Sequence, residues 1–317
     1  MCRLPNYPHD WYTSHMQNCL QSLSLAQKPV RFSVDGADWI GRGILTNLTH
    51  SPAPLKKLTL AHPMESLEIG LRQILKAHPE LEILHIRPRR PWEQLPILSS
   101  SVDATSQSLP KVRKLVLEPS HQDTDFSFPI DALDWSLIMS LRLDHVSAFD
   151  FLSRVGVNQL SNMESFTTHE CETNGSSDAN LRRQTQGQIN ELLLRTRKLR
   201  SFTFIGRAQD DLWLPALRRH GHTLSSLKMH LHDPQEERDP GDFTTHAMFK
   251  FDDIRSLVDH FPKLMELTLD LQLTEGMEFC REWCKVSTAF IVSTMSLLYI
   301  CRQPKDNIPT KHTLYRS

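Results

Sequence analysis

Apolar residues recur along the chain in a six-position phrase, L-x-x-L-x-L, in which the first, fourth and sixth positions are apolar. Leu264, Leu267 and Leu269 form one clear copy. Earlier copies begin, 25 to 40 residues apart, at Leu55, Leu81, Val112, Ile138, Met163, Leu199 and Leu224. The Met163 copy is the only one with a polar residue, Thr168, at its sixth position. Self-similarity at this period is typical of proteins built from stacked repeats.

Each phrase predicts a short strand, and the residues that follow it predict a helix. After the first phrase, apolar residues follow spacings of three and four, the pattern of one helix face, at Met64, Leu67, Leu71, Ile74 and Leu75. Further helices are expected over residues 149–160, 181–196, 211–220 and 245–260. We therefore expect an α/β solenoid of about eight irregular units, with parallel strands on the concave face and helices on the convex face.

The repeats are expected to occupy residues 30–273, beginning with an atypical unit whose strand covers residues 30–34. Residues 1–29 form a poorly specified lead-in, and residues 274–317 form an irregular C-terminal segment. Within that segment, residues 286–301 are weakly apolar, but the run is shorter than the roughly 20 residues of a membrane span. It predicts a terminal helix or an irregular end, with a membrane-tethered scaffold as the alternative.

Composition excludes several classes of protein. The 36 basic and 37 acidic residues give a formal net charge of −1, so no overall charge favours nucleic acid or a membrane surface. Six scattered cysteines are too sparse for a disulfide framework, and the N-terminus lacks the apolar run of a signal peptide. We expect a cytoplasmic or nuclear protein.

Sequence motifs for catalysis are missing. The chain has no glycine-rich phosphate loop and no G-x-S-x-G turn, so we expect no enzyme activity, no cofactor and no metal. One alternative stays open, because alternate residues of a strand share a face. His220, His222, His230, His232 and Asp233 supply ligand types that suit a transition metal. Residues 220–233 are therefore the candidate region for a metal-dependent or other small enzyme, such as a hydrolase.

The residues at the third and fifth positions of each phrase, and the residue that follows its sixth position, are expected to point out of the core onto the concave face of the sheet. Glu118 is one of them. Solenoids commonly bind proteins along such a face, and charged groups there set the choice of partner. The candidate partner-binding residues are His85, Arg87, Arg142, Asp144, His169, Lys228 and His230.

The phrases, together with the joints His78-Pro-Glu-Leu81, Leu109-Pro-Lys-Val112 and Phe261-Pro-Lys-Leu264, resemble the irregular leucine-rich repeats of fungal F-box proteins. The resemblance covers residues 30–273 and implies a leucine-rich-repeat-like solenoid that binds a protein on its concave face. It also implies a role as the substrate-recognition part of an F-box-type ubiquitin-ligase receptor. The segment that opens with Leu4-Pro5 does not continue as an F-box, so a ubiquitin-ligase adaptor is a partner only by analogy with the family.

Overall fold

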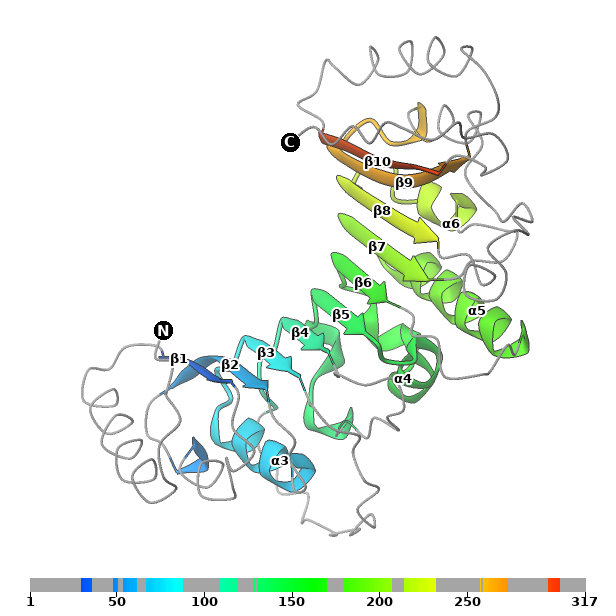
Figure 1. The fold of residues 1–317 in the computed structure, drawn as a ribbon. Coiled ribbons are helices and arrows are strands. Elements are labelled where there is room, and N and C mark those ends of the chain that lie inside the picture. The colour runs from blue at the N-terminus through cyan, green and yellow to red at the C-terminus, as the bar shows by residue number, and fades with distance from the viewer. Residues whose placement is uncertain are drawn as a thin grey trace, which may run out of the picture. The chain divides into compact units, whose positions relative to one another are not determined.

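The computed structural model contains one parallel sheet, in which hydrogen-bonded strands follow one another in chain order from β1 to β10 (Figure 1). The residues that the structure describes are 30–35, 48–50, 54–61, 67–87, 109–118, 128, 130–169, 179–206, 214–231, 257, 259–272 and 296–302. The sheet is open, because its first and last strands are not neighbours. The predicted α/β class, with sequential parallel strands as in a leucine-rich-repeat-like solenoid, is confirmed.

The chain divides into two compact units, Met1–Phe202 and Thr203–Ser317. In the first unit each strand pairs in parallel with the next one along the chain. Its strands are β1 (Val30–Asp35), β2 (Leu55–Ala61), β3 (Ile83–Ile86), β4 (Lys114–Leu117), β5 (Ser140–Asp144) and β6 (Ser165–His169). The strand expected over residues 30–34 is therefore present as β1 and extends the sheet beyond the first phrase.

The connections of the first unit contain helices on one side of the strands, as α3 and α4 show in Figure 1. They are α3 (Leu67–Ala77), α4 (Ala148–Val155) and α5 (Ala179–Arg195), with 3-10 turns η1 (Ile130–Ala132), η2 (Trp135–Leu137) and η3 (Val157–Leu160). Ser147 caps the start of α4, and Gly156 ends it with a φ of 80°, a conformation that glycine adopts without strain. The helix expected over residues 149–160 is therefore divided at this glycine.

The second unit contains β7 (Ser201–Gly206), whose first two residues belong to the first unit, and α6 (Leu214–Arg218). Strands β8 (Ser226–Leu231), β9 (Glu266–Gln272) and β10 (Ser296–Arg302) follow, and they pair in parallel in this order. Most of the helix expected over residues 245–260 lies outside the described residues. None of the helices that the structure describes is both long and apolar enough to cross a membrane.

Strand β10 corrects one expectation for the C-terminal segment. Residues 296–301 of this strand belong to the apolar run 286–301, for which the sequence predicts a terminal helix or an irregular end. Residues 296–302 instead pair with β9 over seven residue positions. Backbone hydrogen bonds to an available strand edge favour an extended conformation that helical spacing alone does not reveal. Residues 286–295 lie outside the described part of the chain.

The eight phrases form the core. All 24 of their residues at the first, fourth and sixth positions are 4% exposed or less. In β3, for example, Leu84 and Ile86 are buried, whereas His85 between them is partly exposed. Apolar residues of the helices, such as Leu71 and Leu152, are buried as well. The repeated phrase is therefore the inward face of consecutive strands, as the sequence predicts.

Thr168 is the one polar residue at an inward phrase position, and it provides a test of this core. Its side chain is fully buried, and its hydroxyl oxygen has no hydrogen-bond partner in the described structure. A buried hydroxyl without a partner costs about 1–3 kcal/mol, and valine has nearly the same shape without that cost. We expect Thr168→Val to raise the free energy of unfolding by about 1 kcal/mol, measured by urea denaturation. Lower stability would instead indicate that the hydroxyl is hydrogen-bonded in solution.

Candidate functional site

The outward side chains of the first unit form rows that run across the strands, because the parallel register pairs equivalent positions of successive phrases. In β5 and β6, for example, Arg142 pairs with Thr167, and Asp144 pairs with His169. One row contains Thr59, His85, Val116, Arg142 and Thr167. The next row, at the carboxyl ends of the strands, contains Arg87, Glu118, Asp144 and His169.

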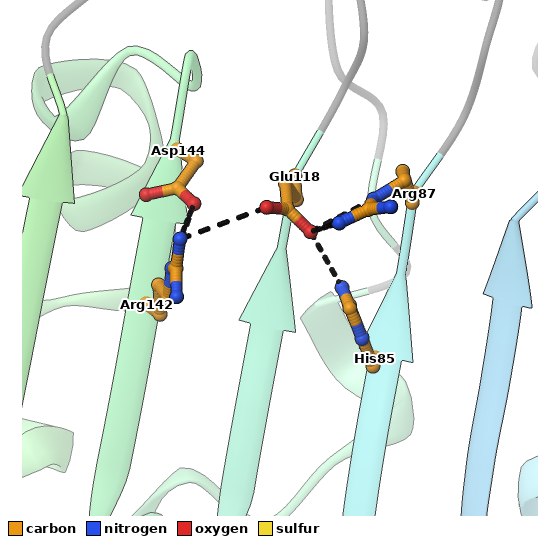
Figure 2. Close-up of polar contacts among 5 residues, drawn as sticks. All are labelled: His85, Arg87, Glu118, Arg142 and Asp144. Carbon is orange, nitrogen blue, oxygen red and sulfur yellow. Dashed lines mark hydrogen bonds and ion pairs between the residues drawn. The ribbon is translucent and has the colours of Figure 1, made fainter.

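Glu118, which follows β4, is the centre of an ionic network between these two rows (Figure 2). Its Oε2 atom accepts hydrogen bonds from Nε and Nη2 of Arg87, at 2.9 and 2.7 Å, and from Nε2 of His85, at 2.8 Å. Its Oε1 atom lies 3.6 Å from Nη2 of Arg142. Arg142 in turn donates from Nε to Oδ2 of Asp144 at 2.6 Å. Three adjacent strands are thereby linked by charged side chains.

The charges of this network are held in place by hydrogen bonding. Burial by itself would raise the pKa of Glu118, but the hydrogen bonds from Arg87 and His85 outweigh it, and the pKa lies below its ordinary value. The hydrogen bond to Asp144 raises the pKa of Arg142, against a smaller opposing effect of burial. Glu118 is therefore a carboxylate at neutral pH, and both arginines are cations.

The negatively charged side chains of the network are less exposed to solvent than the positively charged ones. The side chains of Glu118 and Asp144 are 20% and 7% exposed, whereas those of Arg87 and Arg142 are 46% and 50% exposed. The carboxylates thus orient the guanidinium groups, and the guanidinium groups present the larger surface to solvent. A planar guanidinium held in this way is well suited to pair with a carboxylate from another molecule.

A pair of imidazole rings adjoins the network at the ends of β5 and β6. His145 follows Asp144 with a φ of 56°, a left-handed conformation uncommon outside glycine. Its backbone N–H donates to the carbonyl of His169 at 3.0 Å, and the two ring centroids are 4.4 Å apart. The Nδ1 atom of His145 is buried without a hydrogen-bond partner among the described residues. The predicted site residue His169 therefore lies beside Asp144 and the ionic network.

The remaining predicted site residues, Lys228 and His230, belong to the second unit. Nζ of Lys228 lies 2.6 Å from Oε1 of Glu266, and the Ser226 hydroxyl donates to Oε2 of Glu266 at 2.8 Å. The hydrogen bond from Lys228, followed by that from Ser226, lowers the pKa of Glu266. His230 lies on β8, one alternate position beyond Lys228, and is partly exposed.

The structure describes only part of residues 220–233, the region in which the sequence allows a metal site. His220 is buried, His222 is exposed and His230 is partly exposed, while His232 and Asp233 lie outside the described residues. Among the residues that the structure does describe, no three His, Cys, Asp or Glu side chains are grouped so that they would hold a metal ion. The described part of this region therefore adds no support to a metal site.

Two residues of the site were not among the sequence candidates. Glu118 is an outward residue by the sequence pattern but not one of the candidate contacts, although it directly follows its phrase, as Arg87 and Asp144 follow theirs. Aligning the phrases by that position would have found it. His145 lies outside the phrases, and the sequence carries no signal for its left-handed backbone or for its contact with His169.

Comparison with known proteins does not name the fold. No protein-family model matches the chain, and no curated protein matches it significantly. The similarity to repeat solenoids therefore depends on the sheet itself, in which eight consecutive strands, β2 to β9, each carry one copy of the phrase.

Proposed function

We propose that this protein is a non-enzymatic protein-binding scaffold that uses the outward face of its parallel sheet. The observation that carries the proposal is the network of His85, Arg87, Glu118, Arg142 and Asp144 (Figure 2). It crosses three adjacent strands and holds two half-exposed guanidinium groups in fixed positions. Side chains that are ordered before binding lose less conformational entropy when a partner binds, so they favour recognition.

The arrangement supports binding more than catalysis. Both carboxylates of the network are paired with cations, and the pKa of Glu118 is lowered rather than raised toward neutrality. A general acid or base works best with a pKa near the operating pH, which is the opposite shift for a carboxyl group. The resemblance to fungal F-box proteins suggests a more specific version of this function, in which the bound protein is a ubiquitin-ligase substrate.

Site-specific photo-cross-linking tests the proposed face. We expect a benzoylphenylalanine that replaces Thr167, an outward residue of β6 beside Arg142, to cross-link a partner in extracts of the source cells. The matched control replaces Ser153, an exposed residue of α4, and we expect no cross-link there. Mass spectrometry would identify the linked protein.

Cross-linking at position 153 but not at position 167 would contradict a partner-binding sheet face. No cross-link at either position, with both variants folded by circular dichroism, would count against the scaffold proposal as a whole.

A further inference from the structure

The outward positions of β2 to β6 carry an excess of positive charge. Among the positions that the structure describes, the cations are Lys57, Arg87, Lys114 and Arg142, and the carboxylates are Glu118 and Asp144. The whole chain, by contrast, has 36 basic and 37 acidic residues. Lys57 and Lys114 form no ion pair within the described residues, and Lys114 is exposed. The charge of this face therefore complements an acidic partner.

The spacing of the two arginines indicates the form of that partner. Arg87 follows β3 and Arg142 lies on β5, so their strands are about 10 Å apart at roughly 4.8 Å per strand. Both guanidinium groups nevertheless reach one carboxylate, that of Glu118 (Figure 2). The two guanidinium groups are thus closer together than the two strands that carry them. In an extended peptide, side chains on one face recur about every 6.8 Å, which is also shorter than the distance between the two strands.

We propose that this face binds an extended acidic segment of a partner protein, with carboxylates at alternate positions paired to Arg87 and Arg142. The proposal rests on the proposed scaffold function and names the chemistry of the partner. Each arginine uses Nε and Nη2 within the network, which leaves the N–H groups of Nη1 for an incoming carboxylate. Repulsion from Glu118 and Asp144 is limited, because these carboxylates are less exposed than the guanidinium groups they contact.

Fluorescence polarisation with a defined peptide tests the inference on the full chain. The probe is a labelled, end-capped nonapeptide in which Glu alternates with Thr, and the control peptide carries Gln in place of Glu. We expect the Glu peptide to bind, the Gln peptide to bind at least about ten-fold more weakly, and affinity to fall as salt is raised. Equal binding of the two peptides would overturn the proposal.

Variants identify the residues that bind the peptide. Arg87→Gln is the leading change, because Glu118 keeps His85 and Arg142 as partners. We expect it to weaken peptide binding about ten-fold. The matched control is Arg195→Gln on α5, a comparably exposed arginine paired with Glu191, and we expect it to leave affinity unchanged. Equal affinity of the Arg87→Gln variant and the unaltered protein would contradict the assignment.

Arg142 requires a different design, because its removal alone would leave the buried Asp144 without its cation. The double change Arg142→Gln with Asp144→Asn removes both charges together. We expect this variant to bind the peptide about ten-fold more weakly while it retains the circular dichroism spectrum of the unaltered protein. Retained affinity in the folded double variant would show that Arg142 does not contact the segment.

The two proposals fail in different ways. A partner cross-linked at position 167, together with no binding of the Glu peptide, would overturn the acidic segment and keep the scaffold. Failure of both experiments would remove the scaffold as well. Binding of a single-stranded oligouridylate more tightly than the Glu peptide, with the same dependence on Arg87, would replace the acidic segment by a nucleic acid.

Discussion

Replacement of Phe166 by alanine is expected to lower the free energy of unfolding by about 3–5 kcal/mol, the range observed for large aromatic residues in protein cores. Phe166 occupies the fourth position of its phrase, is fully buried, and lies beside Phe202 of the next phrase, with 6.2 Å between the ring centroids. The change removes a whole ring from between two repeats. A stacked array gains most of its stability from such contacts between neighbours.

The neighbouring residue Thr167 supplies the matched control. It lies on the same strand but at an outward position, where it is partly exposed. Because it contributes little to the core, we expect Thr167→Ala to change the free energy of unfolding by no more than about 0.5 kcal/mol. Urea denaturation followed by circular dichroism would measure both variants. Similar decreases in the free energy of unfolding for the two variants would contradict the assignment of Phe166 to the core and of Thr167 to the outward face.

The inward face of the sheet could be predicted because the phrase is a local pattern with an unambiguous physical cause. A strand buried on one face needs an apolar residue at every second position. The first position of each phrase adds a buried residue at the start of the strand or just before it. Even Thr168 and Met163 obey this rule, since both are fully buried. Knowledge of which strand neighbours which was not needed for this inference, because each copy of the phrase specifies its own orientation.

The ionic network could be predicted only in part, because it depends on the register between strands. The outward rule identified His85, Arg87, Arg142 and Asp144 as candidates. Which of them meet is decided across β3, β4 and β5, and the connecting residue is Glu118. The left-handed backbone of His145 and the pairing of β10 with β9 are tertiary features of the same kind. The pattern of charged residues along a single strand therefore does not predict these features.

Gly221 illustrates a constraint that no single-strand pattern reveals, and it gives the second large effect on stability. It lies in the turn that follows α6, and its backbone N–H donates to the carbonyl of Arg218 at 3.1 Å. A β-carbon at this position would collide with the carbonyl oxygen of His260, which is 39 residues further along the chain. Backbone atoms move less readily than the end of a side chain. We therefore expect Gly221→Ala to destabilise the second unit by about 1–3 kcal/mol.

Gly187 provides the opposite expectation for the same chemical change. It is exposed near the middle of α5, and a β-carbon there would meet no atom within 4 Å. Alanine favours the helix over glycine, so Gly187→Ala should raise the free energy of unfolding by about 0.5–1 kcal/mol. Thermal and urea unfolding of both variants would measure the two changes in the free energy of unfolding, which we expect to have opposite signs. If Gly221→Ala also proved stabilising, the close approach of the turn to His260 would be absent in solution.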